Sequence, residues 1–229
     1  IDVKEPARGS LGRAEARAVA AVAQAVGDRV PWTLAAGELA EGVDALAAWL
    51  GAVREALPEG AAGPAAVKVG LAGMCGSDWQ ACLARFRAQL PDGCEQVAVA
   101  YADFDCVNAP APLDIIASGA RLGAGMLLID TADKRSPGLF GLRSHDEIAG
   151  WVAAARVSGL GVVLAGRIAL GEIHRAAAQG CDFVALRSAV CSNAGDGDAR
   201  LGHVSAGLVA AAVAAWSSAP AIPGDLINP

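Results

Sequence analysis

The lysines are the residues of this chain whose type points most directly to chemistry. The sequence has 18 Lys and Arg residues, and only three of them are lysines, Lys4, Lys68 and Lys134. A lysine amine can lose its proton and form an imine with a carbonyl group, whereas the guanidinium group of arginine does neither. Any one of the three is most simply explained as an ordinary surface cation. Lys4 and Lys68 stand among apolar residues, which favours the uncharged amine that Schiff-base chemistry needs.

Three aspartates lie at positions where a parallel sheet could bring them close to the lysines. Asp2, Asp103 and Asp130 each lie at the end of an apolar run of strand character. A carboxylate at that position can orient a lysine or move protons during carbon–carbon bond formation. Asp103 is explained equally well as the N-cap of a following helix. Asp130 is the stronger candidate, because it follows a fully apolar run and precedes Lys134 by four residues.

Glycine and arginine follow two of the later apolar runs. Gly166 follows one of them, and Arg187 and Ser188 end the other. Glycine lets backbone N–H groups approach a phosphate closely, and arginine binds a phosphate with two hydrogen bonds. Ser10 belongs to a second glycine-rich segment, residues 8–12, ahead of an expected helix. The predicted substrate- and phosphate-binding residues are therefore Asp2, Ser10, Asp103, Gly166, Arg187 and Ser188.

Short apolar runs alternate along the chain with longer, alanine-rich helical patterns. The predicted strands are residues 1–3, 30–35, 66–71, 96–102, 126–130, 161–165 and 183–187. The predicted helices include residues 13–26, 39–57, 78–90 and 144–158, and Ser144 followed by Glu147 is a typical helix start. The strands are continuously apolar, as in a parallel sheet covered by helices on both faces.

This order of elements predicts either a doubly wound sheet or a (β/α)8 TIM-type barrel. No G-x-G-x-x-G follows the first strand, so the sequence lacks the motif that usually indicates a dinucleotide-binding sheet. We therefore expect the barrel, formed by residues 1–216 as a single domain with a C-terminal tail at 217–229. Because a barrel needs eight strands and seven are visible, we also expect one further strand and helix upstream of Ile1.

Composition excludes several other classes. A net charge of −6 without a run of basic residues argues against a nucleic-acid surface. The longest apolar stretch, residues 204–216, is too short to span a membrane. The six cysteines contain no C-x-x-C, so we expect no metal site and a reduced, cytoplasmic protein.

Several motifs occur in an order that resembles one family. They are I-D-V-K-E-P-A-R-G-S-L-G at 1–12, V-K-V-G-L-A-G at 67–73, Y-A-D at 101–103, L-I-D-T-A-D-K at 128–134, L-A-G at 164–166 and A-L-R-S-A-V-C at 185–191. Over nearly its whole length the chain resembles the (5-formylfuran-3-yl)methyl phosphate synthases of methanofuran biosynthesis. Members of that family carry a strand and a helix ahead of the I-D-V-K motif.

The resemblance implies a (β/α)8 barrel that condenses two molecules of glyceraldehyde 3-phosphate, with loss of phosphate and water. It implies a lyase that needs neither a metal nor an organic cofactor. By this resemblance Lys4 is the Schiff-base residue and Lys68 is the proton acceptor, while Asp130 and Lys134 assist. All four side-chain types are present at the matching positions.

Two alternatives stay open at this point. One is a class I aldolase-like barrel that forms a Schiff base with another sugar phosphate. The other is a barrel that binds a sugar phosphate without converting it. The expected partners are small triose phosphates, not nucleic acid or membrane, and assembly into identical copies is left open by the sequence.

Overall fold

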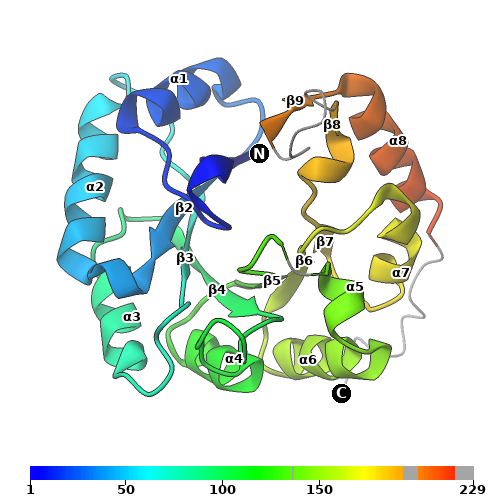
Figure 1. Ribbon diagram of the computed structural model, residues 1–229. Helices are drawn as coiled ribbons and strands as arrows, with labels where there is room; N and C mark the ends of the chain where they lie inside the picture. Colours follow the sequence, from blue (N-terminus) through cyan, green and yellow to red (C-terminus); the bar gives the residue numbers. More distant parts are fainter. Residues whose placement is uncertain (136, 193–200, 220–229) are drawn as a thin grey trace.

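The fold is built on one parallel sheet that curves through the middle of the molecule. The computed structural model describes residues 1–135, 137–192 and 201–219. Seven strands lie in the sheet in chain order, each parallel to the next (Figure 1). They are β1 (Asp2–Val3), β2 (Thr33–Glu38), β3 (Ala66–Gly70), β4 (Glu95–Tyr101), β5 (Met126–Asp130), β6 (Gly161–Leu164) and β7 (Phe183–Val184). The seven predicted strands and their parallel pairing are confirmed.

The closed eight-stranded barrel is not confirmed by the described residues. Within the described residues the sheet is open, with β1 and β7 as its two edges. Both edge strands are only two residues long. An eight-stranded sheet can close because tilt and stagger bring its edges together, and these seven parallel strands curve as a part of such a barrel would. A strand and helix upstream of Ile1 stay a prediction.

Helices cover the outer face of the curve (Figure 1). The α-helices are α1 (Ala16–Val26), α2 (Val43–Ala56), α3 (Trp79–Arg87), α4 (Pro112–Arg121), α5 (Leu139–Leu142), α6 (His145–Val157), α7 (Ile173–Ala177) and α8 (Ala206–Ser217). Short 3-10 turns occur at η1 (Pro6–Arg8), η2 (Leu39–Glu41), η3 (Leu170–Glu172) and η4 (Ser188–Val190). The predicted start of α6 is confirmed, because the Ser144 and Glu147 side chains form a reciprocal capping box.

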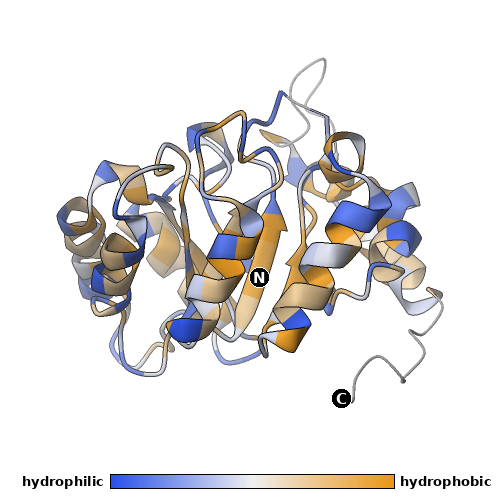
Figure 2. Ribbon diagram, turned by 90° about the horizontal axis from the view of Figure 1, so that it is seen from below, coloured by the Kyte–Doolittle hydropathy of each residue, from blue (hydrophilic) through white to orange (hydrophobic). Residues whose placement is uncertain are grey.

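The core lies on both faces of the sheet, which explains why the strands are continuously apolar. Leu34, Val67 and Ile129 pack outward against the helices. Tyr101 and Leu128 belong to a second apolar cluster on the concave face. Figure 2 shows the hydrophobic strands enclosed by helices whose hydrophilic positions face outward. A parallel sheet buried on both faces needs this pattern.

The last part of the chain differs from the expectation. A two-stranded antiparallel hairpin, β8 (Cys191–Ser192) with β9 (His203–Val204), follows η4 and leads into α8. The apolar stretch at 204–216 is mostly this helix, which ends at Ser217. The predicted tail falls largely on residues 220–229, outside the described residues. None of the helices that the structure describes has both the length and the apolar character needed to cross a bilayer.

Candidate active site

The segment after β1 meets the segment after β5, although about half the chain separates them. The hydroxyl of Ser10 donates to Oδ2 of Asp130 at 2.9 Å and to the carbonyl oxygen of Thr131 at 3.0 Å. Lys4 Nζ donates to the carbonyl oxygen of Ser10 at 3.3 Å. Three strands separate β1 from β5 in the sheet, so it is the curvature of the sheet that brings Lys4 and Ser10 beside Asp130.

Asp130 is a buried carboxylate with several donors. Its Oδ1 accepts from Lys134 Nζ at 2.9 Å and from the backbone N–H of Thr131 at 2.7 Å. Lys134 Nζ also donates to the carbonyl oxygen of Thr131. Burial by itself raises the pKa of Asp130, but Lys134, Lys4 and the hydrogen bonds to the carboxylate outweigh burial and hold the pKa below its usual value. Asp130 is therefore an anion that keeps a cation beside it.

Lys68 forms a separate cluster on the same face of the sheet. Its Nζ lies 2.5 Å from Oδ1 of Asp2 on β1 and 3.1 Å from the hydroxyl of Thr33 on β2. Thr33 in turn donates to the same oxygen of Asp2 at 2.9 Å. The predicted neighbours Asp2 and Lys68 are thus in contact, and Thr33 completes the group.

The three lysines differ in one respect that bears on chemistry. Lys68 and Lys134 each form an ion pair with an aspartate. Among the described residues, Lys4 has no carboxylate within 4.0 Å, and its Nζ donates to the backbone carbonyl of Ser10. An amine that attacks a carbonyl must offer a free electron pair, so Lys4 is the best placed of the three to act as a nucleophile.

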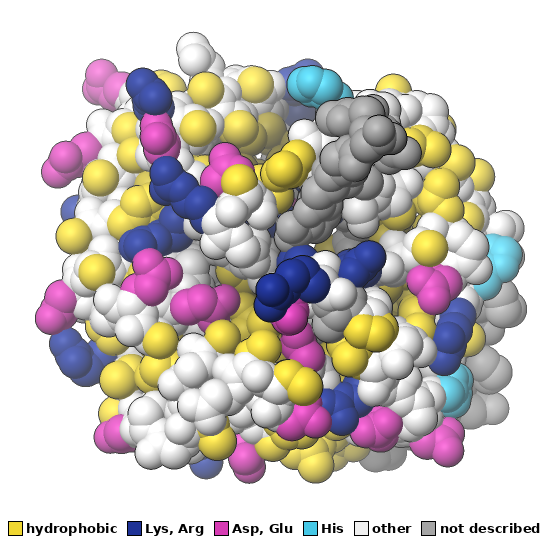
Figure 3. All heavy atoms as spheres, in the orientation of Figure 1, with side chains coloured by type: hydrophobic (Ala, Val, Ile, Leu, Met, Phe, Trp, Pro, Cys, Tyr) yellow, Lys and Arg dark blue, Asp and Glu magenta, His cyan; other side chains and the backbone are white. Residues whose placement is uncertain are grey.

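A single cavity joins these residues, and we name it the lysine cavity. It has a volume of about 680 Å³ and lies on the concave face of the sheet. Its lining includes Lys4, Lys68, Asp130 and Lys134 together with Asp2. On the face shown in Figure 3, Lys and Arg side chains gather near the centre of the ring of helices, next to acidic ones. The residues predicted to be catalytic therefore share one space.

Three of the predicted phosphate-binding residues line the same cavity, namely Gly166, Arg187 and Ser188. Gly166 has a φ of 94°. A Cβ there would lie 2.9 Å from Cγ2 of Thr131, so the loop after β6 approaches the loop after β5 as closely as only glycine allows. Gly166 follows β6, and Arg187 and Ser188 follow β7, so these residues line the cavity beside the lysines.

Asp103 has a different setting. Its two carboxylate oxygens accept the backbone N–H groups of Ala132 and Asp133, both at 2.8 Å. Asp103 does not line the lysine cavity. Its contacts fix the loop that carries Lys134, so it supports the site from outside the lysine cavity.

Sequence reasoning missed two polar groups of this face. One is Thr33, and the other is Glu38, which lies at the end of β2 and accepts a hydrogen bond from the buried hydroxyl of Tyr101 at 2.6 Å. Tyr101 belongs to the Y-A-D motif, but strict alternation along β2 predicts an outward side chain at position 38, whereas the Glu38 side chain lies on the inner face. The described residues include no cluster of three or more His, Cys, Asp or Glu side chains that could hold a metal ion.

The chain is similar to several known proteins. A family model described as 4-HFC-P synthase matches residues 1–213. A (5-formylfuran-3-yl)methyl phosphate synthase of Archaeoglobus fulgidus is 32% identical over 198 residues, which cover 83% of this chain and 81% of that protein. The synthase of the same name from Methanosarcina barkeri is 27% identical over 197 residues, with the same coverage of 83% and 81%.

A solved structure supports the fold. Phosphoribosyl anthranilate isomerase from Thermus thermophilus matches with a TM-score of 0.50 and 19% identity, over 89% of this chain and 80% of that one. At this identity the likeness concerns the fold alone.

Proposed function

The chain belongs to the (5-formylfuran-3-yl)methyl phosphate synthase family, and from this membership we propose that it condenses two molecules of glyceraldehyde 3-phosphate through a Schiff base on Lys4. The product is the furan phosphate named by the family, an intermediate of methanofuran biosynthesis. Atoms balance when one inorganic phosphate and two water molecules leave. The reaction is then a lyase-type synthesis that uses no external oxidant or reductant.

One observation carries this proposal. A single cavity holds all the lysines of the chain together with Asp130, and only Lys4 lacks a carboxylate partner within the described residues. A barrel that only binds sugar phosphates would need cations, which arginine supplies equally well. Three lysines that share one space favour imine and proton-transfer chemistry.

The first triose reacts on Lys4. Its aldehyde carbon forms a C=N bond with Lys4 Nζ, and water leaves. Lys68, after it has passed its own proton to Asp2, takes the proton from C2, the electron pair forms the C2–C3 double bond, and phosphate departs from C3. The positive charge of Lys134 stabilises the departing phosphate, and Asp130 holds Lys134 in place. The result is an enol whose C3 is a nucleophile.

The second triose must react at its central carbon. In the product the phosphomethyl group is at furan position 3 and the formyl group is at position 5. This pattern results when C3 of the first triose attacks C2 of the second, so the carbonyl group of the second triose has to move from C1 to C2. Hydrolysis of the imine and closure of the ring, with loss of two water molecules from the chain, then give the aromatic aldehyde.

Borohydride trapping tests the proposal. With glyceraldehyde 3-phosphate, borohydride should leave one covalent adduct on Lys4, located by mass spectrometry of the peptides. Lys4→Arg keeps the charge and cannot form an imine, so we expect it to lose the adduct and to lower furan formation by about 10⁴-fold or more, a barrier increase of ~5 kcal/mol. Lys68→Arg serves as the matched variant, because it should keep the adduct on Lys4 and lose furan formation.

Other outcomes would favour the alternatives. Release of no phosphate from glyceraldehyde 3-phosphate, with an adduct still present, would favour an aldolase-like enzyme for another sugar phosphate. Binding of the triose without adduct or turnover would favour a binding protein. Full activity of Lys4→Arg would exclude the Schiff base on this residue.

A further inference from the structure

An irregularity at the end of β2 turns Glu38 toward the interior. Ala35 pairs with Lys68 and Glu38 pairs with Gly70, so β2 uses three steps where β3 uses two. The extra residue is accommodated where Gly37 adopts a φ of 86°. Side chains alternate along a strand, and one inserted residue therefore moves Glu38 from the outer to the inner face.

The interior around Glu38 is shaped to receive it. Tyr101 donates its hydroxyl proton to Oε1 at 2.6 Å, and the backbone N–H of Ala72 donates to Oε2 at 3.0 Å. A Cβ on Gly70 would overlap both the Glu38 carboxylate and the Tyr101 hydroxyl. The Glu38 carboxylate and the Tyr101 hydroxyl therefore lie directly over Gly70, which has no side chain.

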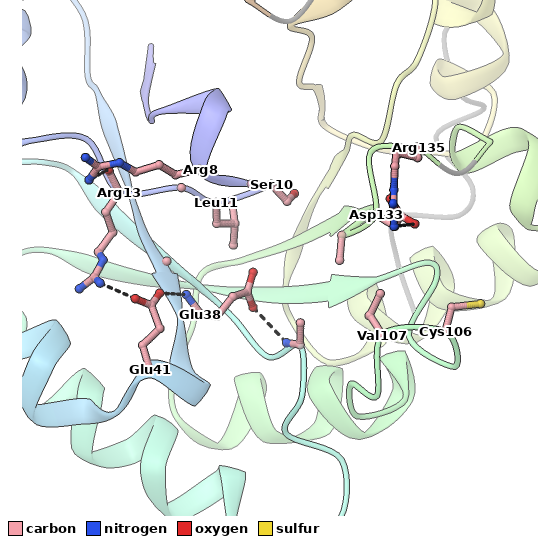
Figure 4. A pocket seen from close by; sticks show the side chains of 15 residues that line it. Arg8, Ser10, Leu11, Arg13, Glu38, Glu41, Cys106, Val107, Asp133 and Arg135 are labelled. Carbon is pink, nitrogen blue, oxygen red and sulfur yellow. Dashed lines mark hydrogen bonds and ion pairs between the residues drawn. The ribbon is translucent and has the colours of Figure 1, made fainter. Parts of the chain in front are cut away.

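Glu38 borders a second cavity, which we name the arginine cavity. This space of about 530 Å³ is lined by residues that include Arg8, Arg13 and Arg135. Figure 4 shows Glu38 between Arg8 and Arg13 on one side and Arg135 on the other. Gly9 and Leu11 line both this cavity and the lysine cavity, so molecules held in the two would be neighbours.

The surroundings of Glu38 make its carboxylate more basic than usual. Burial raises its pKa, and the negative charges of Glu41 on η2 and Asp130 on β5 add to the increase. The hydrogen bonds from Tyr101 and Ala72 act in the opposite direction without cancelling the increase. Burial, followed by the charge of Glu38, raises the pKa of Tyr101 well above its usual value, so this phenol keeps the proton that it donates.

We propose that Glu38 is a further catalytic residue, the base that moves the carbonyl group of the second triose phosphate from C1 to C2 while that molecule occupies the arginine cavity. This inference rests on the proposed function, which requires such a shift. Glu38 takes the proton from C2, the electron pair forms the C1–C2 double bond of an enediol, and the hydroxyl proton on O2 passes to O1. Glu38 then returns its proton to C1, so no atom is gained or lost.

The arginine cavity suits this substrate. Arg8 and Arg135 offer N–H groups from opposite sides of the cavity to the phosphate of the triose. Glu38 lies between them, where the carbon atoms of the triose would lie. A glutamate whose pKa is raised toward the working pH is the kind of base that removes a proton next to a carbonyl group.

Bypass of the isomerisation is the decisive experiment. The protein is prepared from cells without triosephosphate isomerase, and furan formation is followed by ultraviolet absorbance. On glyceraldehyde 3-phosphate alone, we expect Glu38→Gln to lower kcat by about 10²-fold or more. When dihydroxyacetone phosphate is supplied together with glyceraldehyde 3-phosphate, we expect its kcat to return to within a few-fold of the unsubstituted protein.

Two variants serve as controls. Asp44→Asn removes an exposed carboxylate of α2 that pairs with Arg85, and it should leave both rates unchanged. Lys68→Arg should stay inactive with either substrate mixture. Wild-type kcat for Glu38→Gln on glyceraldehyde 3-phosphate alone would overturn the inference, and so would a loss that the ketone does not restore.

Tyr101→Phe provides a second measurement that does not depend on removing Glu38. Loss of the phenol removes a hydrogen bond that lowers the pKa of Glu38, so the acid limb of the kcat profile on glyceraldehyde 3-phosphate should move to higher pH. An unmoved limb, or one displaced to lower pH, would count against Glu38 as the titrating base. If the unsubstituted protein forms neither a Lys4 adduct nor a furan, the proposed function fails. If it forms both and Glu38→Gln behaves normally, only the inference about Glu38 fails.

Discussion

The two ion pairs of the lysine cavity have the same chemical components and different surroundings. Lys134 pairs with Asp130, and Lys68 pairs with Asp2, at N–O distances of 2.9 and 2.5 Å. Both lysine side chains are 11% exposed, but the Asp130 side chain is 5% exposed and that of Asp2 is 32% exposed. Asp130 lies on a central strand and Asp2 on the edge strand β1. The short N–O distance of the second pair thus says little about its contribution to stability, which depends on access to water.

This difference also indicates separate duties. The Asp130 carboxylate is fixed by Ser10, Thr131 and Lys134, so it suits a fixed charge that orients other groups. The Asp2 side chain is partly exposed to solvent, so Lys68 can exchange a proton with Asp2 and Asp2 with solvent. The second arrangement suits the role of proton acceptor proposed for Lys68, because such a residue must be reset in each cycle.

The largest stability effect is expected at the central pair. Asp130→Asn leaves the Lys134 ammonium group buried without a counter-charge, and we expect the free energy of unfolding to fall by about 3–5 kcal/mol. Urea denaturation measures this change. The double variant Asp130→Asn with Lys134→Met should recover part of the loss, because it removes the unpaired charge. Equal losses in the single and double variants would show that the charge of Lys134 is not the cause.

A smaller effect is expected at the edge pair. Asp2→Asn still leaves Lys68 its contact with Thr33 and access to water, so we expect a loss of about 1 kcal/mol in the same assay. Asp44→Asn, whose side chain is 95% exposed, provides the baseline for a surface pair. A loss at Asp2 as large as that at Asp130 would contradict the role assigned to water access.

The smallest expected effect is the change with pH in the contribution of Asp130 to the free energy of unfolding. Because the pKa of Asp130 is lowered in the folded protein, its ionised form stabilises the fold above the unfolded pKa of about 3.9. That contribution is lost as the pH falls through the lower folded pKa. The difference in unfolding free energy between the protein and Asp130→Asn should therefore be constant above about pH 5 and shrink below about pH 4. A difference that grows toward acid pH would mean that Asp130 is protonated in the folded state at neutral pH.

Much of the candidate site could be predicted from residue types and positions in the chain. The scarcity of lysine singled out Lys4, Lys68 and Lys134, and the apolar runs placed them near strand ends. Asp103 shows the limit of this reasoning. The end of β4 is the right place for a catalytic carboxylate, but this one accepts two backbone N–H groups of the loop after β5. Whether Asp103 faces the cavity or holds a loop depends on residues about thirty positions away in the chain. The local sequence around Asp103 carries no signal for that contact.

Glu38 shows a second limit. Strict alternation predicts an outward side chain, and only the pairing of β2 with β3 reveals the additional residue. Gly37 and Gly70 are the local signals that could have suggested it, since one permits the irregular backbone and the other leaves room for the carboxylate. Neither signal states which residue would be turned inward.

The sequence by itself determined the strands, their parallel arrangement and the set of lysines, because apolar runs and residue types are local properties. The tertiary structure decided which carboxylate meets which lysine, that the described sheet stays open between β1 and β7, and that Glu38 faces the interior. These results depend on register and on contacts between residues far apart in the chain, such as Ser10 with Asp130. A shift of one residue in register reverses the face of every side chain in a strand. The contacts of these side chains are therefore fixed only when the strands pair.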